Sequence, residues 1–169
     1  MPAEKISIEN AKKDKLFYFV ANVLVYRNDG KFLLLKRSMR EKVHPGKFCT
    51  IGGKLEWNDL NITKPTRMNG DVFDFEDAVE KLLVKEVKEE AGVKIDTQNL
   101  KYINSVAFVR PDGIPVILVK FAARYKNGEV KIDENDFSDY IWVSSDEVKN
   151  HNCVLGIDKE IEIASHLIK

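Results

Sequence analysis

Three glutamates, Glu86, Glu89 and Glu90, lie three and four residues apart in the most strongly helical stretch of the chain. With about 100° per residue counted from Val79, Glu86 falls at about 340° and Glu90 at about 20°, inside the apolar stripe of the helix. Glu89 falls at about 280°, at the edge of that stripe. Neighbouring carboxylates repel one another, and burying an unpaired one is costly. This spacing therefore favours a hard divalent cation such as Mg²⁺ as their partner.

The helix that positions these glutamates is predicted to run from Phe75 to Ala91. Gly92 is expected to end it, because glycine adopts the left-handed conformation of a helix C-cap without strain. The lysines of the segment fall on the opposite face, which is expected to be solvated. Asp71 or Asp74 is expected to cap the first turn.

A β-hairpin is predicted ahead of the helix, because two apolar runs flank the turn sequence Asn28-Asp29-Gly30. Its strands span residues 16–26 and 31–36. A polar loop over residues 37–47 follows. A short strand over residues 48–51 then leads into Gly52-Gly53.

More strands are predicted beyond the helix, at about 100–109, 114–125 and 140–143. A short helix over residues 146–149 and a last helix over residues 158–168 complete the pattern. This order predicts an α/β protein of the α+β kind, with a mixed sheet between helices on both faces. Residues 57–74 show no clear periodicity, and irregular segments of that length tend to be functional or mobile.

The stretch from Gly52 to Val93 resembles the Nudix box, G-x5-E-x7-R-E-U-x-E-E-x-G-U, in which U is a bulky aliphatic residue. Residues 86–93 match E-U-x-E-E-x-G-U at every position, and the sequence Gly-Gly-Lys-Leu-Glu over residues 52–56 matches the upstream half. The similarity extends to residues 34–37, 45–48 and 140–143. The chain thus resembles the MutT-like Nudix hydrolases.

This resemblance implies a Nudix-type α/β/α sandwich. Residues 16–169 are expected to form a single Nudix domain, and residues 1–15 a polar lead-in. An insertion at about 57–74 splits the box, and we expect it to shape substrate entry as a lid or a dimer arm, unless it is disordered. Because of the split, either Asp59 or Asp77 is a candidate for the first glutamate of the box. Lys85 replaces the box arginine, which keeps the charge but loses the planar fork that binds a carboxylate bidentately.

The resemblance also implies a metal site. Mg²⁺, with Mn²⁺ as a substitute, is expected to be held by Glu86, Glu89 and Glu90 together with the backbone carbonyl of Gly52. Glu89 or Glu90 would accept the proton of the attacking water, while Lys85 would orient a catalytic glutamate. A further acidic ligand is expected from the loop before the Trp142 strand. The candidates are Glu134, Asp136 and Asp139, with Asp136 favoured.

Substrate contacts are expected from four residues near the box: Arg37, Lys47, Lys54 and Glu56. Phe17, Phe19 and Phe108 are candidates for base stacking, although strand aromatics more often belong to the core. The three histidines show no metal-ligand spacing, and Cys49 is expected to be a buried thiol.

The favoured function is hydrolysis of a nucleoside triphosphate, canonical or oxidised, to the monophosphate and pyrophosphate. The alternatives are an ADP-ribose or nucleotide-sugar pyrophosphatase and a non-catalytic nucleotide-binding module. Isopentenyl-diphosphate isomerase shares the fold, but its motifs are not recognisable. A monomer and a homodimer are both compatible with the sequence.

Composition narrows the class of partner. The 169 residues hold 27 Lys and Arg against 27 Asp and Glu, so the formal net charge is zero. Dedicated nucleic-acid and acidic-membrane binders usually carry a basic excess. No apolar run reaches the roughly 18 residues of a membrane span, and two cysteines make no disulfide framework. We therefore expect a cytoplasmic protein that binds neither nucleic acid nor membrane, and the resemblance implies a small nucleotide as its substrate.

Overall fold

A seven-stranded mixed sheet forms the centre of the computed structural model, which describes residues 1–169. Its path runs β3-β2-β1-β8-β7, while β4 pairs with β1 and β9 pairs with β2. Only β1 and β8 are parallel, and the other pairs are antiparallel. The strands of this sheet are β1 (Tyr18–Tyr26), β2 (Phe32–Arg37), β3 (Phe48–Cys49), β4 (Ile51–Lys54), β7 (Lys94–Val109), β8 (Pro115–Asn127) and β9 (Phe137–Val143).

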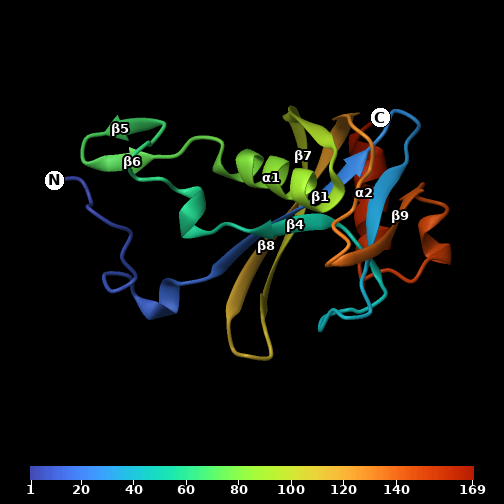
Figure 1. Cartoon of the computed structure of the whole chain (residues 1–169), viewed down its shortest axis with the longest axis horizontal. Helices are drawn as coiled ribbons and strands as arrows, with labels where there is room; N and C mark the ends of the chain where they lie inside the picture. Colours follow the sequence, from blue (N-terminus) through green and yellow to red (C-terminus); the bar gives the residue numbers. More distant parts are fainter.

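Two helices cover the two faces of this sheet, as Figure 1 shows. They are α1 (Ala78–Ala91) and α2 (Ile157–Leu167). Side chains of alternate strand residues point to opposite faces. Ala21 and Val23 therefore pack in one core with α1, whereas Leu24 packs in a second core with α2. This arrangement confirms the predicted α/β/α sandwich.

The shorter elements lie in the connections. Three are 3-10 turns: η1 (Lys13–Lys15), η2 (Trp57–Asp59) and η3 (Val148–Asn150). β5 (Arg67–Asn69) and β6 (Val72–Asp74) form a separate two-stranded hairpin. The insertion at 57–74 therefore contains η2 and this hairpin. Figure 1 places the hairpin near the N-terminus, beyond the first turn of α1.

Several predicted boundaries were wrong. α1 begins at Ala78 rather than Phe75, because Asp77 adopts a left-handed conformation with φ of 56°. Neither Asp71 nor Asp74 caps α1, and Asp74 instead pairs with Arg67 within the hairpin. Gly92 does end the helix in the left-handed conformation, as predicted.

The strands beyond α1 are longer than their sequence patterns indicated. β7 begins at Lys94 rather than near residue 100, and register shifts interrupt its pairing with β8. Polar residues fill this irregular part, which hides the period-2 alternation of a strand. β9 begins at Phe137 instead of Tyr140. No helix in the structure combines the length and the apolar character needed to cross a membrane.

Candidate active site

The two glycines of β4 allow the strand to approach its neighbours very closely. A Cβ atom on Gly53 would lie only 2.3 Å from the carboxyl carbon of Glu86. A Cβ atom on Gly52 would lie 2.3 Å from the carbonyl oxygen of Ala21 on β1. Any larger residue would thus displace either the Glu86 carboxylate or the neighbouring strand.

Glu90 lies one helical turn after Glu86 and reaches the same strand. The backbone N–H of Gly52 donates a hydrogen bond of 3.2 Å to Glu90 Oε2. Burial raises the pKa of Glu90 to about 8. The Gly52 N–H opposes this shift, the charges of Glu86 and Asp136 add to it, and Arg37 opposes it. Glu90 is therefore a buried carboxylate whose charge the surrounding protein only partly compensates.

Burial also raises the pKa of Glu86, while Lys85 opposes that shift and the charge of Glu89 adds to it. The Glu86 side chain is only 15 % exposed, whereas Glu89 is exposed. The order of burial agrees with the helical count, which put Glu86 and Glu90 inside the apolar stripe and Glu89 at its edge. The structure thus brings Glu86 and Glu90 to β4 and leaves Glu89 facing solvent.

Lys85 is held by an aspartate from the insertion. Its Nζ lies 2.8 Å from Asp59 Oδ1 and 3.6 Å from Glu86 Oε1. The other Asp59 oxygen accepts the backbone N–H of Glu56 at 2.9 Å. Burial alone would raise the pKa of Asp59, but Lys85 and this N–H bring it below its usual value. Of the two candidates for the first box glutamate, Asp59 therefore pairs with Lys85, whereas Asp77 precedes the first turn of α1.

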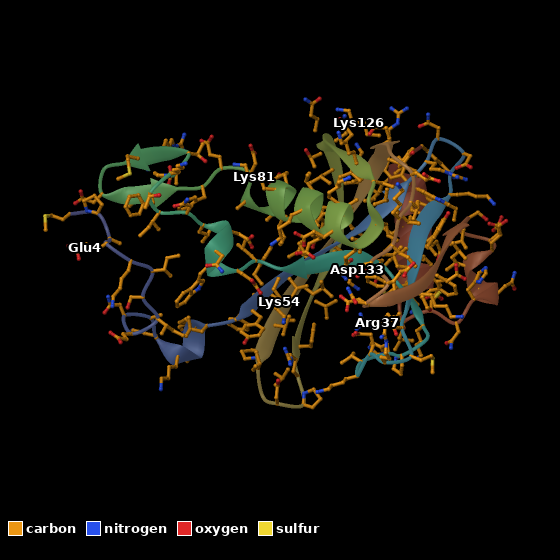
Figure 2. The ribbon with its side chains drawn as sticks, viewed as in Figure 1. Glu4, Arg37, Lys54, Lys81, Lys126 and Asp133 are labelled. Carbon is orange, nitrogen blue, oxygen red and sulfur yellow. The ribbon has the colours of Figure 1, made fainter.

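Of the four predicted substrate-contact residues, Arg37 alone lines a pocket together with Glu90. Its side chain also donates to the carbonyl of Val43 at 2.7 Å. The Nζ of Lys54, a residue labelled in Figure 2, lies 5.5 Å from the centre of the Tyr18 ring.

The other two predicted contact residues have local roles here. Glu56 caps η2 through a reciprocal pair of hydrogen bonds with Asp59. The backbone carbonyl of Lys47 accepts the N–H of Arg37 at 2.9 Å. Neither lines the pocket beside Glu90.

Of the three acidic candidates near the start of β9, Asp136 is the one whose charge acts on Glu90. Asp136 immediately precedes β9, and its carbonyl accepts the N–H of Ser38 at 2.7 Å. The carbonyl of Glu134 accepts a hydrogen bond from Arg40. Asp139 lies exposed within β9.

The aromatic candidates differ in burial. Phe19 packs against the α1 core. Phe17 and Phe108 are 48 % and 43 % exposed, so the expectation that these two belong to the core was wrong. Phe17 immediately precedes β1, and Phe108 lies next to the last residue of β7. Cys49 is a largely buried thiol, as expected, and burial raises its pKa to about 12.

A pocket of about 230 Å³ lies beside Glu90. Gly52 and Asn22 line it from β4 and β1, and Lys120 and Glu160 line it from β8 and α2. Lys120 and Glu160 form a buried ion pair with each other. No motif in the sequence predicted this pair. Its one signal was a charged residue interrupting the apolar run from Ile117 to Ala123.

The donor atoms of the site are of the kind that a divalent cation such as Mg²⁺ takes. No three His, Cys, Asp or Glu side chains converge into a preformed metal cluster. However, Glu86 and Glu90 are two partly buried carboxylates at the same strand, and the charge of Glu86 raises the pKa of Glu90. Carboxylate and backbone carbonyl oxygens are the ligands that Mg²⁺ accepts. The residues present therefore fit such an ion.

The NUDIX domain family matches residues 18–161. This range covers most of the chain, including the two glycines of β4 and the glutamates of α1. The chain therefore belongs to the NUDIX family.

Named relatives and solved structures agree with this assignment. The chain is 31 % identical over 146 residues to the NAD-capped RNA hydrolase NudC of Pseudomonas aeruginosa, which covers 86 % of this chain and 41 % of that protein. The chain thus spans about two fifths of the length of that relative. A second NudC, from Photobacterium profundum, is 31 % identical over 72 residues, 43 % of this chain and 25 % of that protein.

The fold is similar to two solved NUDIX structures. A MutT NUDIX hydrolase from Burkholderia pseudomallei superposes with a TM-score of 0.63 at 18 % identity, over 88 % of this chain and 98 % of that one. The NUDIX domain of Shewanella oneidensis NrtR, complexed with ADP ribose, gives a TM-score of 0.67 at 15 % identity, over 95 % and 96 %. At this level of identity the similarity concerns the fold alone.

Proposed function

We propose that this chain is a Mg²⁺-dependent hydrolase of phosphoric anhydride bonds in nucleotides. One observation carries the proposal: Glu86 and Glu90 lie partly buried against Gly53 and Gly52, respectively, with Lys85 beside Glu86. A protein that only bound nucleotides would gain nothing from two mutually repelling buried carboxylates, which are costly without a cation.

Each residue of the site has a role in this proposal. A bound divalent cation would neutralise charge on the anhydride and lower the pKa of a water molecule. Glu86, Glu89, Glu90 and the Gly52 carbonyl would hold the cation, with Asp136 as a further ligand. Glu89 and Glu90 are the two candidates for the general base that accepts the proton of the attacking water.

Lys85 and Asp59 act through Glu86 rather than on the substrate. The Lys85 ammonium neutralises part of the charge of Glu86 and fixes the direction of its carboxylate. Asp59 in turn holds Lys85 at 2.8 Å. An arginine would bind the Glu86 carboxylate through two N–H groups, which a lysine cannot do. We propose that Asp59 compensates for this loss, because its carboxylate fixes the position of the Lys85 ammonium beside Glu86.

The favoured substrate is a nucleoside triphosphate, canonical or oxidised, cleaved to the monophosphate and pyrophosphate. ADP-ribose and nucleotide sugars are the second candidate, which the similarity to an ADP-ribose complex favours. Relatives named for NAD-capped RNA add that substrate to the set worth testing. A cytoplasmic monomer or homodimer, with Mn²⁺ able to replace Mg²⁺, completes the proposal.

The test is a product assay on the purified chain with Mg²⁺, with Mn²⁺ and with a chelator. The panel holds nucleoside triphosphates, oxidised triphosphates, ADP-ribose, nucleotide sugars, dinucleotide cofactors and NAD-capped RNA. We expect metal-dependent release of a monophosphate product from one class, with loss of turnover in Glu90→Gln. Glu129→Gln, an exposed residue, is the matched control. Folded protein without turnover on any class would favour the binding-module alternative.

A further inference from the structure

A row of polar residues crosses the sheet on the face that α2 covers. Gly52 pairs with Asn22 across β4 and β1, and Asn22 pairs with Lys120 across β1 and β8. Lys120 pairs in turn with Asn104 on β7. Residues paired across adjacent strands present their side chains to the same face. The row therefore leads from the strand beneath Glu90 toward the far edge of the sheet.

The centre of the row is a buried ion pair. Lys120 Nζ contacts Glu160 Oε1 from α2, and their side chains are only 15 % and 6 % exposed. Burying two charges costs more than packing two apolar residues of similar size. The surrounding positions on this face, Leu24 and Ile161, are apolar core residues. An apolar pair would therefore serve the fold at least as well, so the charges call for another explanation.

Both charged groups retain hydrogen-bonding capacity. Each makes its only side-chain hydrogen bond to the other. An ammonium has three donors and a carboxylate about four acceptor sites. In the same row, Asn104 Oδ1 is buried and has no hydrogen-bond partner. Buried polar atoms are normally paired, so the row has unused donors and acceptors.

The pair lines the same pocket as Glu90. Its volume of about 230 Å³ is smaller than the roughly 300–1,000 Å³ that encloses a drug-sized ligand. It suits one part of a nucleotide, such as the base. Leu118, Phe137 and Ile157 supply apolar walls. Glu90 and the Lys120–Glu160 pair line this one pocket, so a nucleotide whose anhydride lies at Glu90 has the ion pair within the same cavity.

We propose that Glu160 and Lys120 select a guanine base. The position of the phosphates in this inference rests on the proposed function. Guanine has two adjacent donors, N1–H and the N2 amino group, beside the acceptor O6. The two donors match the carboxylate of Glu160, and O6 matches the ammonium of Lys120. Adenine, cytosine and uracil lack two adjacent donors, so each leaves part of the buried carboxylate unpaired, which costs binding free energy.

The test measures binding without metal and without turnover. GMP, AMP, CMP and UMP are titrated calorimetrically into the full chain in the presence of a chelator. We expect GMP to bind at least about tenfold more tightly, the usual gain from a good bidentate pair. Glu160→Gln should reduce this preference by about tenfold, because the amide loses one acceptor. Glu162→Gln, an exposed residue of the same helix, should leave it unchanged.

A second variant separates loss of guanine recognition from loss of the fold. The double substitution Lys120→Met with Glu160→Leu removes both buried charges, and such replacements often preserve stability. It should keep the circular dichroism spectrum and melting temperature but lose the GMP preference. Equal binding of the four monophosphates by the native chain would overturn the inference. So would an unchanged GMP preference in the folded double variant.

The same measurements separate this inference from the proposed function. A chain that prefers GMP but hydrolyses nothing in the substrate panel would retain the inference and lose the hydrolase proposal. A chain that hydrolyses nucleotides without any preference for guanine would retain the hydrolase proposal and lose the inference.

Discussion

Glu90 occupies a position where ionisation opposes folding. Its pKa rises from 4.5 to about 8, chiefly through burial. Between these two pH values the folded chain binds a proton that the unfolded chain has released. The free energy of unfolding therefore falls as pH rises through this range, and levels off above it. Glu86 contributes in the same direction, because burial also raises its pKa.

Replacing Glu90 by Gln should remove the larger part of this fall. In chelator above about pH 8, the variant should be more stable than the native chain by about 2–5 kcal/mol, since each pKa unit corresponds to about 1.4 kcal/mol. Urea unfolding at acidic and alkaline pH measures the difference. Glu129→Gln should follow the native curve. A Glu90 variant without any gain at high pH would show that the carboxylate is better compensated than its burial indicates.

The Lys85–Asp59 contact is expected to affect kcat, because it positions the lysine beside Glu86. Asp59→Asn should lower kcat by about 10–100-fold, the usual effect of removing a group that orients a metal ligand. Asp77→Asn is the matched control, because it alters the other candidate and asparagine tolerates the left-handed conformation. Steady-state kinetics on both variants checks this. A larger loss in Asp77→Asn than in Asp59→Asn would reverse the assignment.

Strand β4 and helix α1 together bring the residues of the site into contact. The strand supplies two residues without side chains, and the helix places one carboxylate against each of them. The insertion contributes η2, which carries Asp59 to Lys85. Its hairpin, β5–β6, lies beyond the first turn of α1 in Figure 1. That the insertion shapes substrate entry stays a prediction.

The two glycines should respond differently to alanine. In Gly53→Ala the new methyl group meets the flexible end of Glu86. The fold should survive while kcat falls by at least about tenfold, because small misplacements of a catalytic group are costly. In Gly52→Ala the methyl group meets the backbone of β1, so the free energy of unfolding should fall by about 2 kcal/mol or more. Paired kinetics and thermal unfolding distinguish the two. Equal effects on stability would contradict this account.

At the scale of the whole molecule, stability resides in the two cores on either side of the sheet. Residues 1–15 precede the sheet and contain no buried residue. The amino group of Met1 pairs with Asp71 in the insertion, where both groups are exposed. Such exposed ion pairs contribute little to the free energy of unfolding.

Deleting residues 2–15 should therefore change the free energy of unfolding by less than about 1 kcal/mol. It should also leave kcat and KM unchanged for the substrate identified in the panel. Chemical denaturation and steady-state kinetics on the shortened chain check this. A large loss of stability or activity would show that the lead-in belongs to the folded unit.

Local sequence predicted the orientation of the glutamates on α1, but it did not predict where α1 and β7 begin. The helical count placed Glu86 and Glu90 inward and Glu89 at the edge, because the period of a helix depends only on neighbouring residues. The first turn of α1 was misplaced, because the left-handed conformation of Asp77 is not visible in a pattern of apolar residues. The start of β7 was missed because its register shifts break the alternation that marks a strand.

The sequence by itself therefore determined the box glutamates, the glycines before them, the α/β/α architecture and the family resemblance. These features are set by local spacing. The tertiary structure alone decided that Asp59 rather than Asp77 meets Lys85, and that Lys120 meets Glu160. The partners are 26 and 40 residues apart in the chain. Which of many charged residues become neighbours depends on strand register and helix packing, and no local period encodes that choice.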